Sequence, residues 1–197
     1  MNARSSIAAV CVGLALAACS TPPPPAPVQQ AAPTTTTTAD VPGADPAVWF
    51  DAYCGPMGVM QVGRLQLQGK GREGMAAVKE AAVGWVVAAA ASDRAAADGL
   101  EKLGPMGSDV RSLHERLVKE LRAEAVSFDD RSARLRAQAA DDKFPDRYQQ
   151  IMLGSGGNER IEALFKQTVE TPKYTEAFRA NKVCQEWQAL AKQGGGN

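Results

Sequence analysis

A continuous helical pattern over residues 108–139 is the feature that most constrains the fold of this chain. Its apolar or small positions recur about every 3.6 residues, the α-helical repeat, and are Val110, Leu113, Leu117, Leu121, Ala125, Phe128, Ser132, Leu135 and Ala139. Ser108 is a candidate N-cap, Asp109 suits the positive end of the helix, and Pro145 ends the pattern. Such a helix is stable only when its apolar face packs against other elements.

Residues 75–103 form a second helical pattern, which Gly104-Pro105 ends. Its periodic positions are Met75, Val78, Ala82, Trp85, Ala89, Ser92, Ala96, Leu100 and Leu103. Between residues 81 and 91 every face is apolar, which predicts the most buried helix of the fold. This segment is shorter than the roughly 20 residues that cross a membrane.

Residues 46–67 predict a further helix, which carries Trp49 and Tyr53 on one face. Gly55-Pro56 lies inside it, and proline removes a backbone donor and clashes with the preceding turn. We therefore expect this helix to be kinked or split.

The C-terminal part of the chain predicts short helices separated by turn residues. Residues 146–153 form one helix, and the glycine-rich segment 154–157 separates it from the next. Pro172 then opens a last helix. Strand signals are scarce, so the predicted fold is all-α: an antiparallel bundle of four or five helices over residues 46–193, with a flexible tail at 194–197.

Residues 19–45 are rich in proline and threonine and nearly free of large apolar side chains. Such a segment cannot bury enough surface to offset the entropy of ordering, so we predict a disordered linker. In polyproline conformation, at about 3.1 Å per residue, it would reach roughly 80 Å.

The N-terminus has the pattern of an export signal. Arg4 gives a basic start, residues 5–18 carry no charge, and small residues end the segment. Leu16-Ala17-Ala18-Cys19 resembles the lipobox of bacterial lipoproteins, and with the Pro/Thr-rich linker it resembles envelope lipoproteins of high-GC actinobacteria. The resemblance to the lipobox covers only about the first 20 residues, and an N-terminal membrane helix is the alternative.

The resemblance to lipoproteins implies a signal peptide at residues 1–18 and lipid attached to the sulfur of Cys19. Two or three acyl chains anchor a protein stably, whereas one chain binds only marginally. The mature chain would then be held at the extracytoplasmic face of the cell membrane, with the membrane as its first partner.

Cys54 and Cys184 are the two cysteines that remain once Cys11 leaves with the signal and Cys19 carries lipid. In an oxidising compartment their simplest state is one disulfide, which would join the first and last helices of the domain. Two buried free thiols are the alternative. No metal site is predicted, because zinc requires four close ligands and two cysteines with one histidine do not supply them.

No pattern in the sequence identifies an enzyme, so no catalytic residue and no cofactor is predicted. His114 is the only histidine; we expect it at a solvated boundary position, with a general base or pH switch as the alternative. The segment from Gly63 to Gly71 lacks the spacing and the Ser or Thr of a phosphate loop, and Gln68-Gly69-Lys70-Gly71 is interpreted as an ordinary loop between helices.

Charged residues likewise predict a solvated surface. Asp129-Asp130 and Asp141-Asp142 lie in helical context beside basic residues, unlike the ligands of a calcium loop. The formal net charge is +0, which argues against a nucleic-acid partner because such proteins carry a basic face.

We expect a non-enzymatic binding or interaction module of the cell envelope, with another envelope protein as its partner. The alternative is a carrier or sensor of an apolar small molecule or lipid held between helices, with Trp49, Trp85, Trp187 and Met75 as candidate groove residues. A cavity above roughly 300 Å³ would favour the carrier. A filled core with an exposed apolar patch would favour the protein partner.

The lipobox gives the first testable prediction. Cys19→Ala should release the protein from membranes, because it removes the only sulfur that the motif places for lipidation. Fractionation combined with mass spectrometry of the N-terminal peptide measures this. An unmodified Cys19 in the natural chain, or membrane association that survives the substitution, would contradict it.

Overall fold

The computed structural model describes residues 43–154 and 156–194, and in these ranges the chain is all-helical, as predicted. It has seven α-helices there: α1 Pro46–Gly69, α2 Met75–Leu103, α3 Arg111–Arg136, α4 Phe144–Met152, α5 Gly157–Glu170, α6 Pro172–Ala180 and α7 Lys182–Gln193. The predicted signal peptide, Cys19, nearly all of the linker and the tail residues 195–197 lie outside the described residues.

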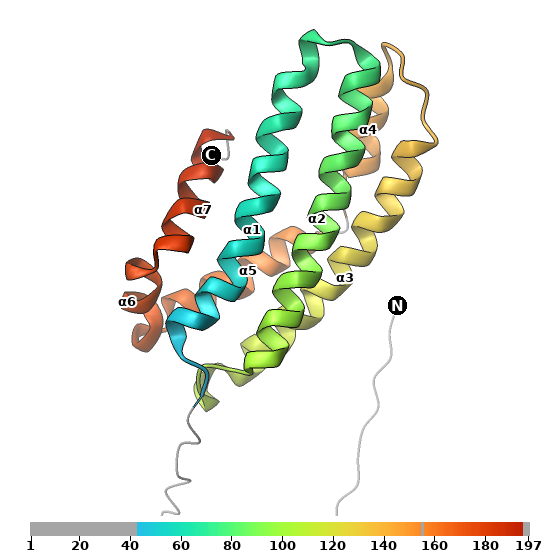
Figure 1. The fold of residues 1–197 in the computed structure, drawn as a ribbon. Helices are drawn as coiled ribbons and strands as arrows, with labels where there is room; N and C mark the ends of the chain where they lie inside the picture. Colours follow the sequence, from blue (N-terminus) through green and yellow to red (C-terminus); the bar gives the residue numbers. More distant parts are fainter. Residues whose placement is uncertain (1–42, 155, 195–197) are drawn as a thin grey trace, which may run out of the picture. The chain divides into compact units, whose positions relative to one another are not determined.

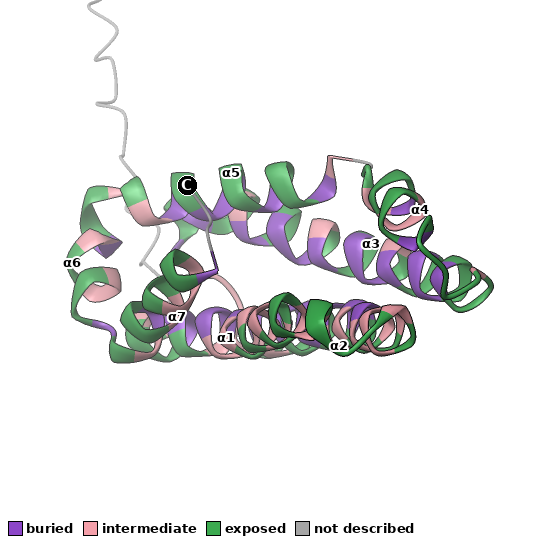
Figure 2. Cartoon of the chain, turned by 90° about the horizontal axis from the view of Figure 1, so that it is seen from above, coloured by how far each residue is buried: buried purple, intermediate pink, exposed green. Residues whose placement is uncertain are grey.

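The three long helices α1, α2 and α3 run alternately up and down, each beside the next (Figure 1). α7 packs against α1, and α5 packs against α3. Seen from above, α1 and α2 form one layer with α7, and α3 and α5 form the other (Figure 2). The helices outnumber the predicted four or five because the short C-terminal segments form separate elements.

α1 continues through Gly55-Pro56 as one helix of 24 residues, so the predicted split is wrong. Its N-terminus is capped by Asp45, whose carboxylate accepts from the backbone N–H groups of Ala47 and Val48. Proline inside a helix costs roughly 3 kcal/mol. The packing of buried side chains on both sides of Pro56, Cys54 and Met57 among them, offsets that cost.

The predicted last helix is two helices, because Asn181 adopts an extended backbone between α6 and α7. Its side-chain oxygen accepts from the backbone N–H of Cys184 at 2.8 Å and so caps α7. Its amide nitrogen donates to Asp51 Oδ1 at 2.8 Å and to the carbonyl of Ala47 at 3.2 Å. Asn181 therefore ends one helix, begins the next and ties α7 to α1.

The two long patterns correspond to α2 and α3, with differences at their edges. α3 begins at Arg111 after a 3-10 turn over Ser108–Val110, so Ser108 is not its N-cap. α2 is not buried all round: it packs between α1 and α3, and its third side exposes Gly84, Val87 and Ala91. By length and composition α2 is the one described helix that could cross a membrane, which is weak support for a span because core helices pass the same test.

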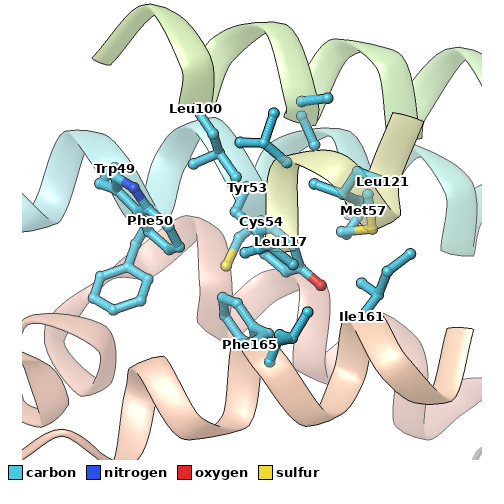
Figure 3. Close-up of a cluster of buried hydrophobic side chains, with 14 of the residues drawn as sticks. Trp49, Phe50, Tyr53, Cys54, Met57, Leu100, Leu117, Leu121, Ile161 and Phe165 are labelled. Carbon is cyan, nitrogen blue, oxygen red and sulfur yellow. The ribbon is translucent and has the colours of Figure 1, made fainter. Parts of the chain in front are cut away.

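The core of the helical domain consists of two apolar clusters. The larger one is built around α1, whose side chains meet those of α2, α3 and α5 (Figure 3). The smaller one lies where α2 meets α3 and α4, around Val86, Phe128 and Phe144. Glycines let α1 and α2 approach closely: a Cβ on Gly99 would lie 3.3 Å from that of Ala52.

The predicted disulfide joins Cys54 of α1 to Cys184 of α7, with a Cα–Cα distance of 5.0 Å. Both cysteines are buried, and the first and last helices of the domain lie side by side as expected.

Removal of this bond should lower stability while leaving the helices formed. In the chain-entropy model, a loop of 130 residues is worth roughly 4–5 kcal/mol, less any native strain. The variant Cys54→Ala with Cys184→Ala should therefore melt well below the natural chain, with nearly unchanged far-ultraviolet circular dichroism at 20 °C. An unchanged melting temperature, or two reactive thiols in the exported protein, would argue against the bond.

Candidate functional site

A pocket of about 520 Å³ lies between the two helical layers and is the candidate site. α1 lines it with Tyr53, Met57, Met60, Gln61 and Arg64. The other walls are formed by Trp85, Asp93, Phe128, Tyr148, Met152, Asn158, Ile161, Glu162, Phe165 and Trp187. Every described α-helix except α6 contributes at least one of these residues.

Buried side chains distinguish this pocket from two other depressions of the described surface. Those depressions measure about 440 and 540 Å³, and none of their lining residues is buried. In the candidate site, by contrast, Tyr53, Phe128 and Phe165 are at most 6% exposed. A concave site that reaches buried apolar and polar groups is the ordinary form of a small-molecule site.

Aromatic rings form much of the pocket wall. Tyr53 and Phe165 stack with their ring centroids 4.0 Å apart. Trp187 meets these two rings edge-on at 5.9 and 5.6 Å, and Trp85 meets Phe128 at 6.1 Å. Met57, Met60 and Met152 also line the pocket. Methionine side chains adapt their shape easily, so this wall suits an apolar ligand.

Three buried polar atoms of the pocket residues have no hydrogen-bond partner within the described part of the chain. They are Gln61 Oε1, Asp93 Oδ2 and Trp187 Nε1. A buried polar group without a partner costs roughly 1–3 kcal/mol, so these atoms mark the polar positions of the site. Trp85 differs from Trp187, because its indole N–H donates to the carbonyl of Met60 at 3.3 Å.

Among the charged residues that line the pocket, Asp93 is the buried one, with 3% of its surface exposed. Burial first, and then the nearby carboxylate of Glu124, raise its pKa from 3.8 to about 7 against the opposing effect of Arg94. The pKa of Tyr53 is also raised, first by burial and then by Asp93 and Glu162, so its hydroxyl stays protonated.

Glu124 forms a buried ion pair with Arg131, which lies about two turns further along α3. Arg131 Nη1 and Glu124 Oε1 are 2.7 Å apart. The Arg131 guanidinium lies 5.0 Å from the centre of the Phe128 ring. Gly154 and Gly157, which follow α4, pack against this pair: a Cβ on Gly154 would lie 2.9 Å from Arg131 Nη2, and a Cβ on Gly157 would overlap Glu124 Oε2. Gly157 is therefore required by its close contact with the Glu124 carboxylate.

The structure places two of the four predicted groove residues at the pocket and two elsewhere. Trp85 and Trp187 line the pocket, whereas Trp49 is buried in the larger core cluster and Met75 lies at the start of α2, away from the lining. Trp49 donates its indole N–H to His114 Nδ1 at 3.1 Å. His114 is 6% exposed, so the predicted solvated position is wrong; burial lowers its pKa, which favours the neutral ring that accepts this bond.

The other sequence candidates lie away from the pocket. Asp129, Asp130, Asp141 and Asp142 are exposed; Asp129 pairs with Arg94 and Asp141 with Arg147. The segment from Gly63 to Gly71 is the end of α1 followed by the 3-10 turn Lys70–Arg72. Among the described residues, no group of three or more His, Cys, Asp or Glu side chains could hold a metal ion.

Asp93 is the site residue that sequence reasoning missed. It follows Ser92 of the apolar pattern and ends a stretch without charge that begins at Ala81. An acidic residue at the buried edge of such a stretch is the signal that would have found it. The chain matches no protein-family model, and comparisons with curated proteins and with solved structures give no match.

The raised pKa of Asp93 predicts a pH-dependent stability. Between about pH 4 and 7 the folded state holds a proton here that the unfolded chain releases, so Asp93 lowers stability as the pH rises and has its full effect above pH 7. Asp93→Asn should therefore add roughly 2–4 kcal/mol at pH 8 and little near pH 4, since one pKa unit is about 1.4 kcal/mol.

The difference in unfolding free energy between variant and natural chain, measured in urea at several pH values, tests this. Taking the difference cancels the contribution of His114, whose lowered pKa makes stability rise with pH, the opposite of the Asp93 effect. A difference that does not change between pH 4 and 8 would show that Asp93 is not held protonated by burial.

Proposed function

We propose that this chain is an exported, lipid-anchored protein of the cell envelope whose helical domain binds an apolar small molecule in the central pocket. The pocket carries the proposal, because its volume of about 520 Å³ exceeds the roughly 300 Å³ at which ligand sites begin. Protein interiors are normally packed without such spaces. Binding of a ligand would restore the dispersion contacts that the aromatic and methionine walls lack.

The anchoring part of the proposal is supported by the sequence. The lipobox at Leu16–Cys19 provides the attachment, and the Pro/Thr-rich linker provides reach from the membrane surface. A pocket held away from the bilayer on a long linker suits a protein that takes up or presents a ligand near the membrane.

A docking function is the second candidate, and one observation favours it. Val59 and Val62 of α1 and Val87 of α2 are 62%, 41% and 40% exposed. These helices pack closely, since a Cβ on Gly63 would lie 3.2 Å from the Trp85 ring. Exposed apolar groups on adjacent helices are a feature of protein-binding surfaces.

The proposed binding can be measured with N-phenyl-1-naphthylamine, an uncharged apolar fluorophore. The purified full chain should carry Cys19→Ala, so that no detergent competes for the pocket. We expect one saturable site per chain with a micromolar dissociation constant. Energy transfer from tryptophan to the probe should accompany binding, because Trp85 and Trp187 line the pocket.

Met152→Trp and Leu153→Trp provide a matched pair of variants. Met152 lines the pocket, so the larger ring should fill it and weaken probe binding at least about tenfold. Leu153 is 80% exposed and its replacement should change nothing. Absence of saturable binding, or equal effects of the two variants, would contradict the pocket as the site. Native mass spectrometry that shows a bound protein in place of a small molecule would favour docking.

A further inference from the structure

We infer that the pocket is selective for a cationic apolar ligand: an organic amine whose protonated nitrogen pairs with Asp93 and whose hydrocarbon body lies against the aromatic wall. The inference rests on the proposed function and specifies the chemical class of its ligand.

The first argument is the unpartnered carboxylate. Asp93 lines the pocket, is 3% exposed, and its Oδ2 has no hydrogen-bond partner in residues 43–154 and 156–194. Gln61 Oε1 of α1 also lines the pocket and is a second buried acceptor without a hydrogen-bond partner there. Two acceptors require donors, and a protonated amine has up to three N–H donors and no acceptor. A carboxylate ligand would place like charges together.

The second argument is the aromatic wall beside these acceptors. The faces of aromatic rings attract cations within about 6 Å of the ring centre. Tyr53, Phe165 and Trp187 form a contiguous set, with centroid separations between 4.0 and 5.9 Å. Tyr53 lies close enough to Asp93 for that carboxylate to raise its pKa. The rings therefore favour a cation, as the Asp93 carboxylate does, and they also suit the apolar body of the ligand.

The third argument is the charge balance. The buried charged groups around the site are Asp93, Glu124 and Arg131, and two carboxylates against one guanidinium leave one negative charge when all are ionised. Arg131 is already paired with Glu124 at 2.7 Å. At the exposed rim, Arg64 and Glu162 have opposite signs. Arg94, beside Asp93 in sequence, is exposed and pairs with Asp129. One ligand cation would neutralise the buried excess.

Three ligands of equal chain length separate these contributions: octylammonium, 1-octanol and octanoate. Their binding to the full chain with Cys19→Ala can be measured by titration calorimetry and by tryptophan fluorescence. At pH 8 we expect octylammonium to bind at least about tenfold more tightly than 1-octanol, and octanoate most weakly. Because burial holds the pKa of Asp93 at about 7, octylammonium affinity should rise roughly tenfold from pH 6 to pH 8, and 1-octanol affinity should stay constant.

Asp93→Asn keeps the side-chain shape and should remove both the preference for the amine and its pH dependence, while 1-octanol still binds. Asp98→Asn is the matched control, because Asp98 lies on the same helix, is exposed and bonds to Arg122. Equal binding of amine and alcohol, or a preference unaffected by Asp93→Asn, would overturn the inference and leave the proposed pocket standing. If none of the three ligands and no neutral probe binds, the proposed function itself fails.

Discussion

The covalent bond between α1 and α7 sets the geometry on which the pocket depends. Tyr53 directly precedes the bonded Cys54, and Trp187 follows Cys184 by one turn of α7. The bond therefore fixes both rings, whose centroids meet at 5.9 Å, and Asn181 adds polar contacts from the start of α7 to α1. With α7 held in place, α1 can present its apolar side chains to α3 and α5 on its other side (Figure 3).

The pocket and the buried charges belong to the same arrangement. In an ordinary core, apolar side chains from α2 and α3 would fill the space between the layers. Here Asp93 lines the pocket, Glu124 and Arg131 are buried nearby on α3, and Gly157 supplies no side chain against Glu124. Buried ionised groups require partners and so resist the close apolar packing that would fill the space. The domain thus gives up some packing for a polar centre, which is a common feature of binding sites.

Periodicity predicted the parts of the fold that depend on which face of a helix is apolar: the all-α class, α2 and α3. The pairing of Cys54 with Cys184 followed separately, from the count of cysteines that remain after the signal peptide and the lipidation. Periodicity failed where the contacts of a single side chain determine the local structure. The break at Asn181 depends on hydrogen bonds to α1, and the burial of His114 depends on a donor, Trp49, that is 65 residues away in sequence. Asp93 was missed for the same reason, since an apolar pattern does not show which polar residue at its edge turns inward.

The long separation of Cys54 and Cys184 has a consequence for the order of folding. α1, α2 and α3 are neighbours in sequence and in space, so their contacts can form early. The bond, however, closes a loop of 130 residues, so it can form only when α7 reaches α1. Trp187 lies on α7 and covers the stacked rings of Tyr53 and Phe165 on that side, so this part of the pocket wall depends on the docking of α7. The pocket is therefore complete only when the two ends of this long loop have come together.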